Sequence, residues 1–408
     1  MQLERSAGWE APKKSADAAA LKAAATMFKR GVGFRFDTEP GEVATRSGSY
    51  DINFVDAQPT LSNFVIIDGS VQRAWPDVKL PAKHLTLTLD EHGKTLDSIA
   101  SIIAAWNAAG KPDKWTIVGG GLLSDVASFA AGLVGANVQL VPTTLLAMAD
   151  ASVGGKTGVN FPPFGKNQVG GFYNPTAVTI WSGWLKTLPP REIRAGGIEC
   201  IKHAFLSGSP VLAQKLAVAI AAGNWSELGA QLPDVVAVKV SIVAEDPGEV
   251  ARRATLNLGH TLGHALEHIS QTKTRGEDTL LHGEAVGIGL VMALMLSVRF
   301  GGLKPDTFHT MLGVLKNSGC LPDPVTLARQ LGGKRLGHPE LFEMALKAMQ
   351  NDKKADGNKL STQWILLEDW GKCAKGDSGG WTTSIFTAEV KRAYGEIAST
   401  YEKLTGRP

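Results

Sequence analysis

The chain has few of the residues on which extracellular or cysteine-based folds depend. Of its 408 residues, three are cysteines (Cys200, Cys320 and Cys373), and none belongs to a CxxC pair. This odd number argues against a disulfide framework or a cysteine zinc knuckle, and it favours a reducing compartment such as the cytoplasm. Aromatic residues make up 7% of the chain, but hydrophobic residues make up 44%, which is enough for a core divided over two domains.

Excess charge and long apolar runs are also lacking. The formal net charge is +3, so we expect no nucleic-acid partner, whereas a small anionic substrate fits this balance. The longest apolar run, residues 285–298, is too short to span a bilayer and predicts a buried helix, so no membrane partner is expected. Glu4, Glu10 and Asp17 argue against a secretory signal or a transit peptide.

Hydrophobic periodicity divides the chain into three parts. Residues 1–48 are rich in alanine, lysine and glycine, and we interpret them as an N-terminal extension. Residues 49–188 alternate between expected strands (63–67, 84–89, 115–118 and 138–141) and expected helices (96–108 and 123–134), which predicts parallel β-α-β units. Pro189 and Pro190 mark a boundary. Residues 189–408 read as helical, with helices expected at 192–206, 210–222, 235–244, 255–269, 284–300 and 341–350.

Two glycine-rich stretches in the first domain are candidates for phosphate binding. Gly119-Gly120-Gly121 joins an expected strand to a helix, where the backbone can approach a pyrophosphate and helix amides can donate. It is not the GxGxxG fingerprint, and a structural turn is an alternative. Residues 141–167 read as a long glycine-rich loop, which suits an anion site or a solvated loop. This loop contains Asp150, Lys156, Asn160, Lys166 and Asn167.

Charged and imidazole side chains interrupt apolar stretches of the second domain. Glu199 and Lys202 share a helix face, and their apolar neighbours favour a functional site over a surface ion pair. His260 and His264, four residues apart, could bind one metal ion, with His282 and Glu199 as further candidates. Spacing alone would select His260 and His264. The charged segment NDKKADG reads as a solvated turn.

Seven segments, taken in their order and spacing, carry a family resemblance. They are GGGLLSDVASF, VPTTLLAMADASVGGKTGVN, FGKNQVGGFYNP, IECIKHAF, NLGHTLGHALE, LHGEAVGIG and NDKKADG. Together they resemble the dehydroquinate synthase family of sugar-phosphate cyclases. The resemblance implies an α/β fold, with an N-terminal Rossmann-like domain that binds NAD and a C-terminal mostly helical domain that binds zinc or cobalt. It also implies a homodimer that converts 3-deoxy-arabino-heptulosonate 7-phosphate to dehydroquinate and phosphate.

The resemblance implies a role for each matching residue. The zinc ligands become Glu199, His260 and His282, which moves His264 from the metal to the substrate phosphate. NAD contacts are expected at Asp68, Ser70, Glu91, Lys94, Gly120, Gly121, Asp125, Thr143, Thr144, Asp150, Lys166 and Thr187. Substrate contacts are expected at Asp150, Lys156, Asn167, Lys202, Lys239, Arg253, Asn257, His264 and Lys354, with Lys239 and Arg253 on the carboxylate. Catalytic roles are expected for Lys156, Lys202, Glu249, Asn257 and His264.

The chain departs from the family pattern in the segment AAGLVGANVQLV, which lacks an arginine that reaches the phosphate of the neighbouring subunit. Related cyclases that act on substrates without a carboxylate typically change the positions of Lys239, Arg253 and Asn257. Their presence therefore favours the heptulosonate substrate. The alternatives are another cyclase, of the aminodehydroquinate or 2-epi-5-epi-valiolone synthase type, then a metal-dependent polyol dehydrogenase or a non-catalytic relative.

Overall fold

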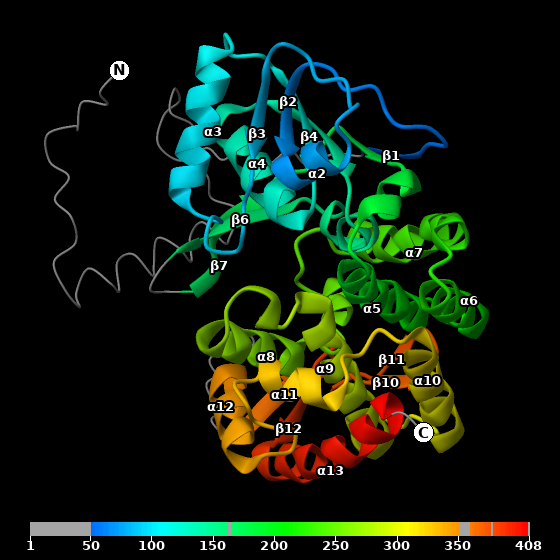
Figure 1. Cartoon of the computed structure of the whole chain (residues 1–408). Coiled ribbons are helices and arrows are strands. Elements are labelled where there is room, and N and C mark those ends of the chain that lie inside the picture. Colours follow the sequence, from blue (N-terminus) through cyan, green and yellow to red (C-terminus); the bar gives the residue numbers. More distant parts are fainter. Residues whose placement is uncertain (1–49, 162–164, 351–359, 377, 407–408) are drawn as a thin grey trace, which may run out of the picture. The chain divides into compact units, whose positions relative to one another are not determined.

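The computed structural model describes residues 50–161, 165–350, 360–376 and 378–406 (Figure 1). They form two compact units. The first unit contains the described residues up to Asn53, together with Thr60–Val141 and Gly155–Thr179, and the second contains Phe54–Pro59, Pro142–Gly154 and the described residues from Ile180 onward. The expected extension at residues 1–48 and the expected substrate contact Lys354 lie outside the described residues.

A six-stranded sheet forms the core of the first unit, in the order β1-β8-β5-β4-β2-β3. The strands are β1 (Asp51–Phe54), β2 (Phe64–Asp68), β3 (His84–Leu87), β4 (Lys114–Gly119), β5 (Asn137–Pro142) and β8 (Ala177–Ile180). β2 pairs in parallel with β3 and with β4, and β5 pairs in parallel with β8. Val65, Ile66 and Ile67 are fully buried, as expected for a strand covered on both faces.

The helices of the first unit are α2 (Gly69–Ala74), α3 (Leu96–Ala108) and α4 (Gly121–Val134). α3 begins after Thr95, whose side chain accepts a hydrogen bond from the Ser98 amide. α4 ends at Gly135, which adopts a left-handed conformation with φ 72°. α4 packs on both β4 and α3 (Figure 1). The predicted α/β alternation is therefore confirmed.

The prediction of one long loop at residues 141–167 is wrong in part. Ala147–Ala151 form the short π-helix η1, and β6 (Lys156–Phe161) pairs antiparallel with β7 (Gly165–Phe172). A Cβ on Gly170 would lie 2.3 Å from Thr157 O, and one on Gly158 would lie 2.9 Å from Val169 O. The glycines that suggested a loop therefore allow two strand backbones to approach closely.

The second unit is mostly helical, as predicted. Its helices are α5 (Pro190–Ser207), α6 (Pro210–Ala221), α7 (Trp225–Glu245), α8 (His260–Lys273), α9 (His282–Leu296), α10 (Pro305–Ser318), α11 (Pro324–Gln330), α12 (Pro339–Gln350) and α13 (Thr387–Thr405). Two antiparallel pairs join β9 (Ser361–Trp364) with β12 (Thr383–Phe386), and β10 (Leu367–Asp369) with β11 (Lys372–Cys373).

α9 is apolar on all sides, and its residues from Gly283 to Leu296 are buried. By length and composition alone, the stretch His282–Gly301 could cross a membrane. However, 83% of its most apolar window is buried inside the protein, which is the behaviour of a core helix. The prediction of a buried helix at this position is confirmed.

Candidate metal centre and substrate site

Close backbone contacts at glycines hold α5, α8 and α9 together. A Cβ on Gly283 of α9 would lie 1.9 Å from Ala195 O of α5. A Cβ on Gly289 of α9 would lie 1.8 Å from Gly259 O, directly before α8. A side chain at either position would displace a backbone. The glycines therefore bring three helices together near His282, the first residue of α9.

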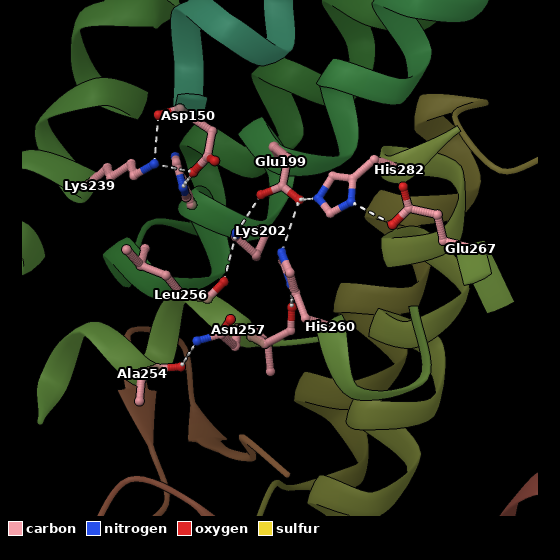
Figure 2. Close-up of polar contacts among 12 residues, drawn as sticks. Asp150, Glu199, Lys202, Lys239, Ala254, Leu256, Asn257, His260, Glu267 and His282 are labelled. Carbon is pink, nitrogen blue, oxygen red and sulfur yellow. Dashed lines mark hydrogen bonds and ion pairs between the residues drawn. The ribbon is translucent and has the colours of Figure 1, made fainter. Parts of the chain in front are cut away.

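Glu199 of α5, His260 of α8 and His282 of α9 face one another in this region (Figure 2). Glu199 Oε1 lies 3.8 Å from His260 Nε2 and 3.6 Å from His282 Nε2. Candidate ligand atoms of all three lie within 4.8 Å of one another. Glu199 is fully buried, and within the described residues its carboxylate forms an ion pair with Lys202. A buried carboxylate beside two imidazoles suits a metal ion, and one carboxylate with two histidines suits catalytic zinc.

Both imidazoles are oriented through their other ring nitrogen. His260 Nδ1 lies 3.1 Å from Leu258 O, and His282 Nδ1 lies 3.3 Å from Glu267 Oε2. If each Nδ1 carries the proton that is donated, each Nε2 presents its lone pair on the side of Glu199. The tautomer that a metal needs is thus the one that the hydrogen bonds favour.

His264 lies beside these three residues. Its ring centroid is 5.1 Å from that of His260 and 5.8 Å from that of His282. His264, Glu267 and His282 form a second group of residues whose ligand atoms are close enough to hold a metal ion. Glu267, however, already contacts Nδ1 of His282. The group around Glu199 therefore leaves His264 as an exposed imidazole near the metal centre.

Burial and neighbouring charges shift the pKa of each candidate ligand. Burial would raise the pKa of Glu199, but Lys202, His282 and His260 lower it far below its ordinary value. Burial and Lys202 hold the pKa of His260 well below its ordinary value, so this ring is neutral. Burial lowers the pKa of His282, but the carboxylates of Glu199 and Glu267 raise it to about 10. The raised pKa means that a proton and a metal ion would compete for this ring.

Lys202 connects the candidate metal centre to the next expected site residues. Its ammonium forms an ion pair with Glu199 and donates to Leu256 O at 2.8 Å (Figure 2). Lys202 is 1% exposed, so its charge acts in a poorly solvated environment. Leu256 directly precedes Asn257, whose side chain donates to Glu249 Oε1 at 3.3 Å and to Ala254 O at 3.1 Å.

Asp150 and Lys239 form a second charged pair. Lys239 Nζ lies 2.8 Å from Asp150 Oδ1 and donates to Asp150 O at 2.6 Å (Figure 2). His203, which is fully buried, places Nε2 3.4 Å from the same carboxylate oxygen. Burial would raise the pKa of Asp150, but Lys239, His203 and Lys202 hold it well below its ordinary value. Sequence reasoning missed His203, although its place directly after Lys202 in an apolar helix was a signal.

Asp246 shapes the loop that carries Arg253. Its carboxylate accepts hydrogen bonds from the amides of Val250 (2.9 Å), Ala251 (2.7 Å) and Arg253 (2.9 Å). Within this loop, Glu249 adopts a left-handed conformation with φ 57°. Such a conformation is uncommon for a residue with a Cβ, and it persists where the surrounding contacts hold it. Asp246 was also missed, because nothing in its spacing reveals these contacts.

Arg253 is held rigidly. Its guanidinium donates to Gly154 O at 2.9 Å and to Pro247 O at 2.8 Å, and the residue is 2% exposed. Gly154 has a φ of 97°, and a Cβ there would lie 2.4 Å from Arg253 Nη2. Besides Lys202, the second unit thus contains the buried cations Lys239 and Arg253, which are expected to bind a carboxylate.

In the first unit, expected NAD contacts lie at the carboxyl ends of β2 and β4. Asp68 ends β2 and accepts from Ser70 through the amide (2.8 Å) and the hydroxyl (2.7 Å). A Cβ on Gly119, at the end of β4, would lie 3.3 Å from Asp68 Cβ. Gly120 precedes α4, which has no side-chain cap, so the amides at its N-terminus suit an anion.

Other expected NAD contacts pair with one another in the first unit. Lys94 Nζ donates to Asp125 Oδ2 at 2.5 Å. Glu91 Oε1 accepts from Asn160 Nδ2 at 2.8 Å and lies 3.3 Å from Lys166 Nζ. Glu91, Lys166 and Asn160 therefore share one polar cluster, which connects the segment after β3 with the β6–β7 hairpin.

The remaining expected residues have varied surroundings. The Thr144 hydroxyl accepts from the Ala147 amide at 3.1 Å, and the Thr187 hydroxyl donates to Trp184 O at 3.4 Å. Both contacts are local and support the backbone. The Thr143 hydroxyl is buried without a hydrogen-bond partner in the described part of the chain, which suits a ligand contact.

The expected phosphate contacts Lys156 and Asn167 lie on β6 and β7 of the first unit. Asn167 has a φ of 49°, and its amide donates to Asn160 Oδ1 at 2.9 Å. The segment without the expected arginine forms the end of α4 and most of β5. It is largely apolar, and Ala131 and Val138 are fully buried.

Comparison with known proteins identifies the family of this chain. Residues 84–195 match the family described as 3-dehydroquinate synthase N-terminal, and residues 196–355 match 3-dehydroquinate synthase C-terminal. The chain is 41% identical over 292 residues to 3-dehydroquinate synthase of Methylacidiphilum infernorum. This match covers 70% of this chain and 74% of that relative. It is 46% identical over 285 residues to 3-dehydroquinate synthase of Pseudomonas aeruginosa, and this match covers 69% of this chain and 72% of that relative.

A solved structure of 2-epi-5-epi-valiolone synthase from Streptomyces hygroscopicus, with NAD+ and Zn2+ bound, has a similar fold. The TM-score is 0.70 at 23% identity, and the match covers 88% of this chain and 99% of the other. At this identity the likeness shows a shared fold, and it agrees with the α/β unit and the helical unit described above. Both halves of the family pattern are present in order, and the chain belongs to the 3-dehydroquinate synthase family.

Proposed function

We propose that the chain converts 3-deoxy-D-arabino-heptulosonate 7-phosphate to 3-dehydroquinate and phosphate. This is the 3-dehydroquinate synthase reaction, a carbon–oxygen lyase step of the shikimate pathway to aromatic amino acids. The observation that carries the proposal is the convergence of Glu199 Oε1 with Nε2 of His260 and His282, in a member of this family. Such a carboxylate–imidazole trio is typical of a catalytic metal.

The proposed enzyme uses NAD and one Zn2+ or Co2+ ion. Glu199, His260 and His282 would hold the metal, since the carboxylate is buried and the two rings direct Nε2 toward it. The NAD set would be the residues named from the family resemblance, supported by the uncapped N-terminus of α4 beside Asp68. When bound, NAD accepts and returns a hydride, and the metal polarises substrate oxygens.

The cationic side chains would bind the two acidic groups of the substrate. Lys239 and Arg253 are buried and held by hydrogen bonds, so they would bind the carboxylate with little loss of side-chain entropy. Lys156, Asn167, Lys202, Asn257, His264 and Lys354 would bind the phosphate. A fixed phosphate can remove the neighbouring ring proton with its own oxygen, so these residues act by positioning and charge.

Glu249 would act next to this phosphate set, beside its member Asn257. Their side chains are hydrogen-bonded at 3.3 Å, and Asn257 follows Leu256, which accepts from Lys202. Glu249 would accept a proton from the substrate, and its left-handed backbone would keep the carboxylate in place. His264, an exposed imidazole beside the metal trio, would exchange protons with the phosphate.

The proposal extends to organisation and location. We assign NAD binding to residues 49–188 and metal and substrate binding to residues 189–408, with residues 1–48 as an extension. We also propose a cytoplasmic homodimer. The family habit supports the dimer, although the segment AAGLVGANVQLV lacks the arginine that would cross its interface.

The test is to incubate the purified chain with 3-deoxy-D-arabino-heptulosonate 7-phosphate, NAD and zinc, and to measure phosphate release. A chelator-treated sample serves as the control and should release none. No release from a sample with bound NAD and metal would contradict the proposal. Release from sedoheptulose 7-phosphate alone would indicate a 2-epi-5-epi-valiolone synthase. Release only from the aminated heptulosonate analogue would indicate aminodehydroquinate formation, and net reduction of NAD by a polyol would indicate a dehydrogenase.

A further inference from the structure

Arg191 and Glu284 form a bidentate ion pair between α5 and α9. Arg191 Nε donates to Glu284 Oε1 at 2.7 Å, and Nη2 donates to Oε2 at 2.7 Å. The Glu284 side chain is 6% exposed and that of Arg191 is 29% exposed. Paired, parallel hydrogen bonds of this kind fix direction as well as distance. The pair therefore sets the mutual orientation of the first turns of two helices.

The same pair also holds the chain that leads into His282. Arg191 Nη2 donates to Thr279 O at 2.7 Å, and the Leu281 amide donates to Glu284 Oε2 at 2.9 Å. These backbone groups lie directly before His282, while Glu284 lies two residues after it. The contacts thus fix His282 from both sides along the chain.

Two further contacts make this arrangement rigid. Gln330 of α11 donates to Glu284 Oε2 at 3.1 Å. The backbone contact between Gly283 and Ala195 lies between the ion pair and Glu199. Along α5, Arg191 precedes Glu199 by about 12 Å, the rise of eight helical residues. Arg191 is therefore too far along α5 to touch Glu199, yet the ion pair is built into the helices that carry Glu199 and His282.

We propose that Arg191 and Glu284 are positioning residues for the metal centre, which hold His282 in register with Glu199. The inference rests on the proposed metal site. Its physical basis is that a metal needs its ligand atoms in place within a few tenths of an ångström. A small shift of the first turn of α9 would move His282 Nε2 directly, because His282 is the first residue of that helix.

A purely structural role makes a different prediction. If the pair only joined two helices, its loss would lower the melting temperature and leave the affinity for zinc unchanged. A comparable pair allows the comparison: Arg299, in the π-helical turn that continues α9, pairs with Glu396 of α13. This pair also ties the α9 segment to a neighbouring helix, but at the end opposite to His282.

The experiment compares Arg191→Lys, Glu284→Gln and the control Arg299→Lys with the unaltered chain. Zinc affinity is measured by competition with a chromophoric chelator, ligand geometry by the visible spectrum of the Co2+-loaded protein, and fold stability by melting of the metal-free protein. We expect the first two variants to bind zinc about 10–100-fold more weakly, as for other residues that orient metal ligands. Their Co2+ spectra should change, and Arg299→Lys should retain both properties.

Unchanged zinc affinity and an unchanged Co2+ spectrum in both variants would overturn the inference, whatever happens to the melting temperature. If Arg191→Lys fails to fold, Glu284→Gln decides alone, because it keeps the side-chain volume and an acceptor for the Leu281 amide. If the unaltered chain itself binds no zinc, the proposed metal site and this inference both fail. If the unaltered chain binds zinc and both variants bind it equally tightly, the inference fails and the proposed function stands.

Discussion

Glu267 Oε2 lies 3.3 Å from His282 Nδ1, on the side of the ring opposite to Glu199. Glu267 therefore fixes both the rotation and the tautomer of this imidazole. A carboxylate behind a metal-bound histidine also makes the ring a stronger donor. Glu267→Gln should weaken zinc binding by about 10-fold or more, because the amide can turn its NH2 group toward the ring and favour the wrong tautomer.

The measurement is a competition titration with a chromophoric chelator at fixed pH. His268→Gln, at the next position of α8 and exposed, is the matched control and should bind zinc like the unaltered chain. Equal affinity in the Glu267 variant and the control would show that the contact does not orient a metal ligand.

His282→Ala should lose metal and activity together, whereas His264→Ala should lose activity and keep stoichiometric metal. The reason is geometric, since Nε2 of His282 converges on Glu199 with His260, and His264 stands beside this group. Metal content after dialysis, measured by atomic emission, distinguishes the two variants. Stoichiometric zinc in His282→Ala, or its loss in His264→Ala, would contradict the ligand assignment.

The sequence predicts the elements whose signal is local. The helix at residues 96–108 has a capping threonine, and the strand expected at 63–67 contains the continuous apolar run 64–67, so both are found close to their expected limits. α7 begins at Trp225, earlier than the expected 235–244, because Pro233 lies inside the helix although proline usually ends one. The β6–β7 hairpin is missed because its glycines act through the partner strand, which a local pattern does not contain.

The candidate site also divides into residues with a local sequence signal and residues whose role depends on the fold. Spacing alone selects His260 and His264, because these two residues share one helix. The trio that the structure brings together comes from three helices, and only the family resemblance selected it. His203 and Arg191 are missed because their partners are distant in the sequence. Asp246 is missed although its partners are close in the sequence, because nothing in its spacing reveals the contacts with backbone amides.

Asp246 should make stability depend on pH on the acid side. Burial would raise its pKa, but hydrogen bonds from the amides of Val250, Arg253 and Ala251 lower it below the ordinary value. Because the pKa of Asp246 is lower in the folded protein, its contribution to stability is complete above about pH 5. This contribution is lost as the pH falls below the ordinary pKa of an aspartate, about 3.9, toward the lower pKa of the folded protein. Asp246→Asn should cost about 1–3 kcal/mol at pH 7 and flatten this acid limb.

Urea unfolding at a series of pH values from neutral to acid tests this expectation. Asp113→Asn, at an exposed position of the first unit, is the control and should leave the pH profile unchanged. If the free energy of unfolding of Asp246→Asn depends on pH in the same way as that of the unaltered chain, Asp246 is not the cause of this pH dependence.

Lys239 and Asp150 should be coupled in stability. Lys239→Met removes the positive charge beside the Asp150 carboxylate, so we expect the free energy of unfolding to fall by about 2 kcal/mol. Breaking a fully buried ion pair costs more, but Asp150 is partly exposed. The double variant Lys239→Met with Asp150→Asn should lose less than the sum of the two single variants. Lys372→Met, from an exposed pair with Glu368, is the control and should cost far less stability than Lys239→Met. Additive losses in urea unfolding would show that Lys239 and Asp150 are not coupled.

Gly283→Ala tests whether close packing of α5 against α9 supports the candidate metal centre. The added methyl would lie 1.9 Å from Ala195 O, so a backbone must move, at a cost of about 1–3 kcal/mol. Gly313→Ala in α10 is the matched control, because its methyl meets nothing within 4 Å. This control should stabilise the helix by about 0.5–1 kcal/mol, since alanine has the higher helix propensity. Urea unfolding and zinc competition on both variants should show opposite signs in stability and weaker zinc binding in Gly283→Ala alone. Equal zinc affinity in the two variants would mean that the metal ligands tolerate a shift of α9.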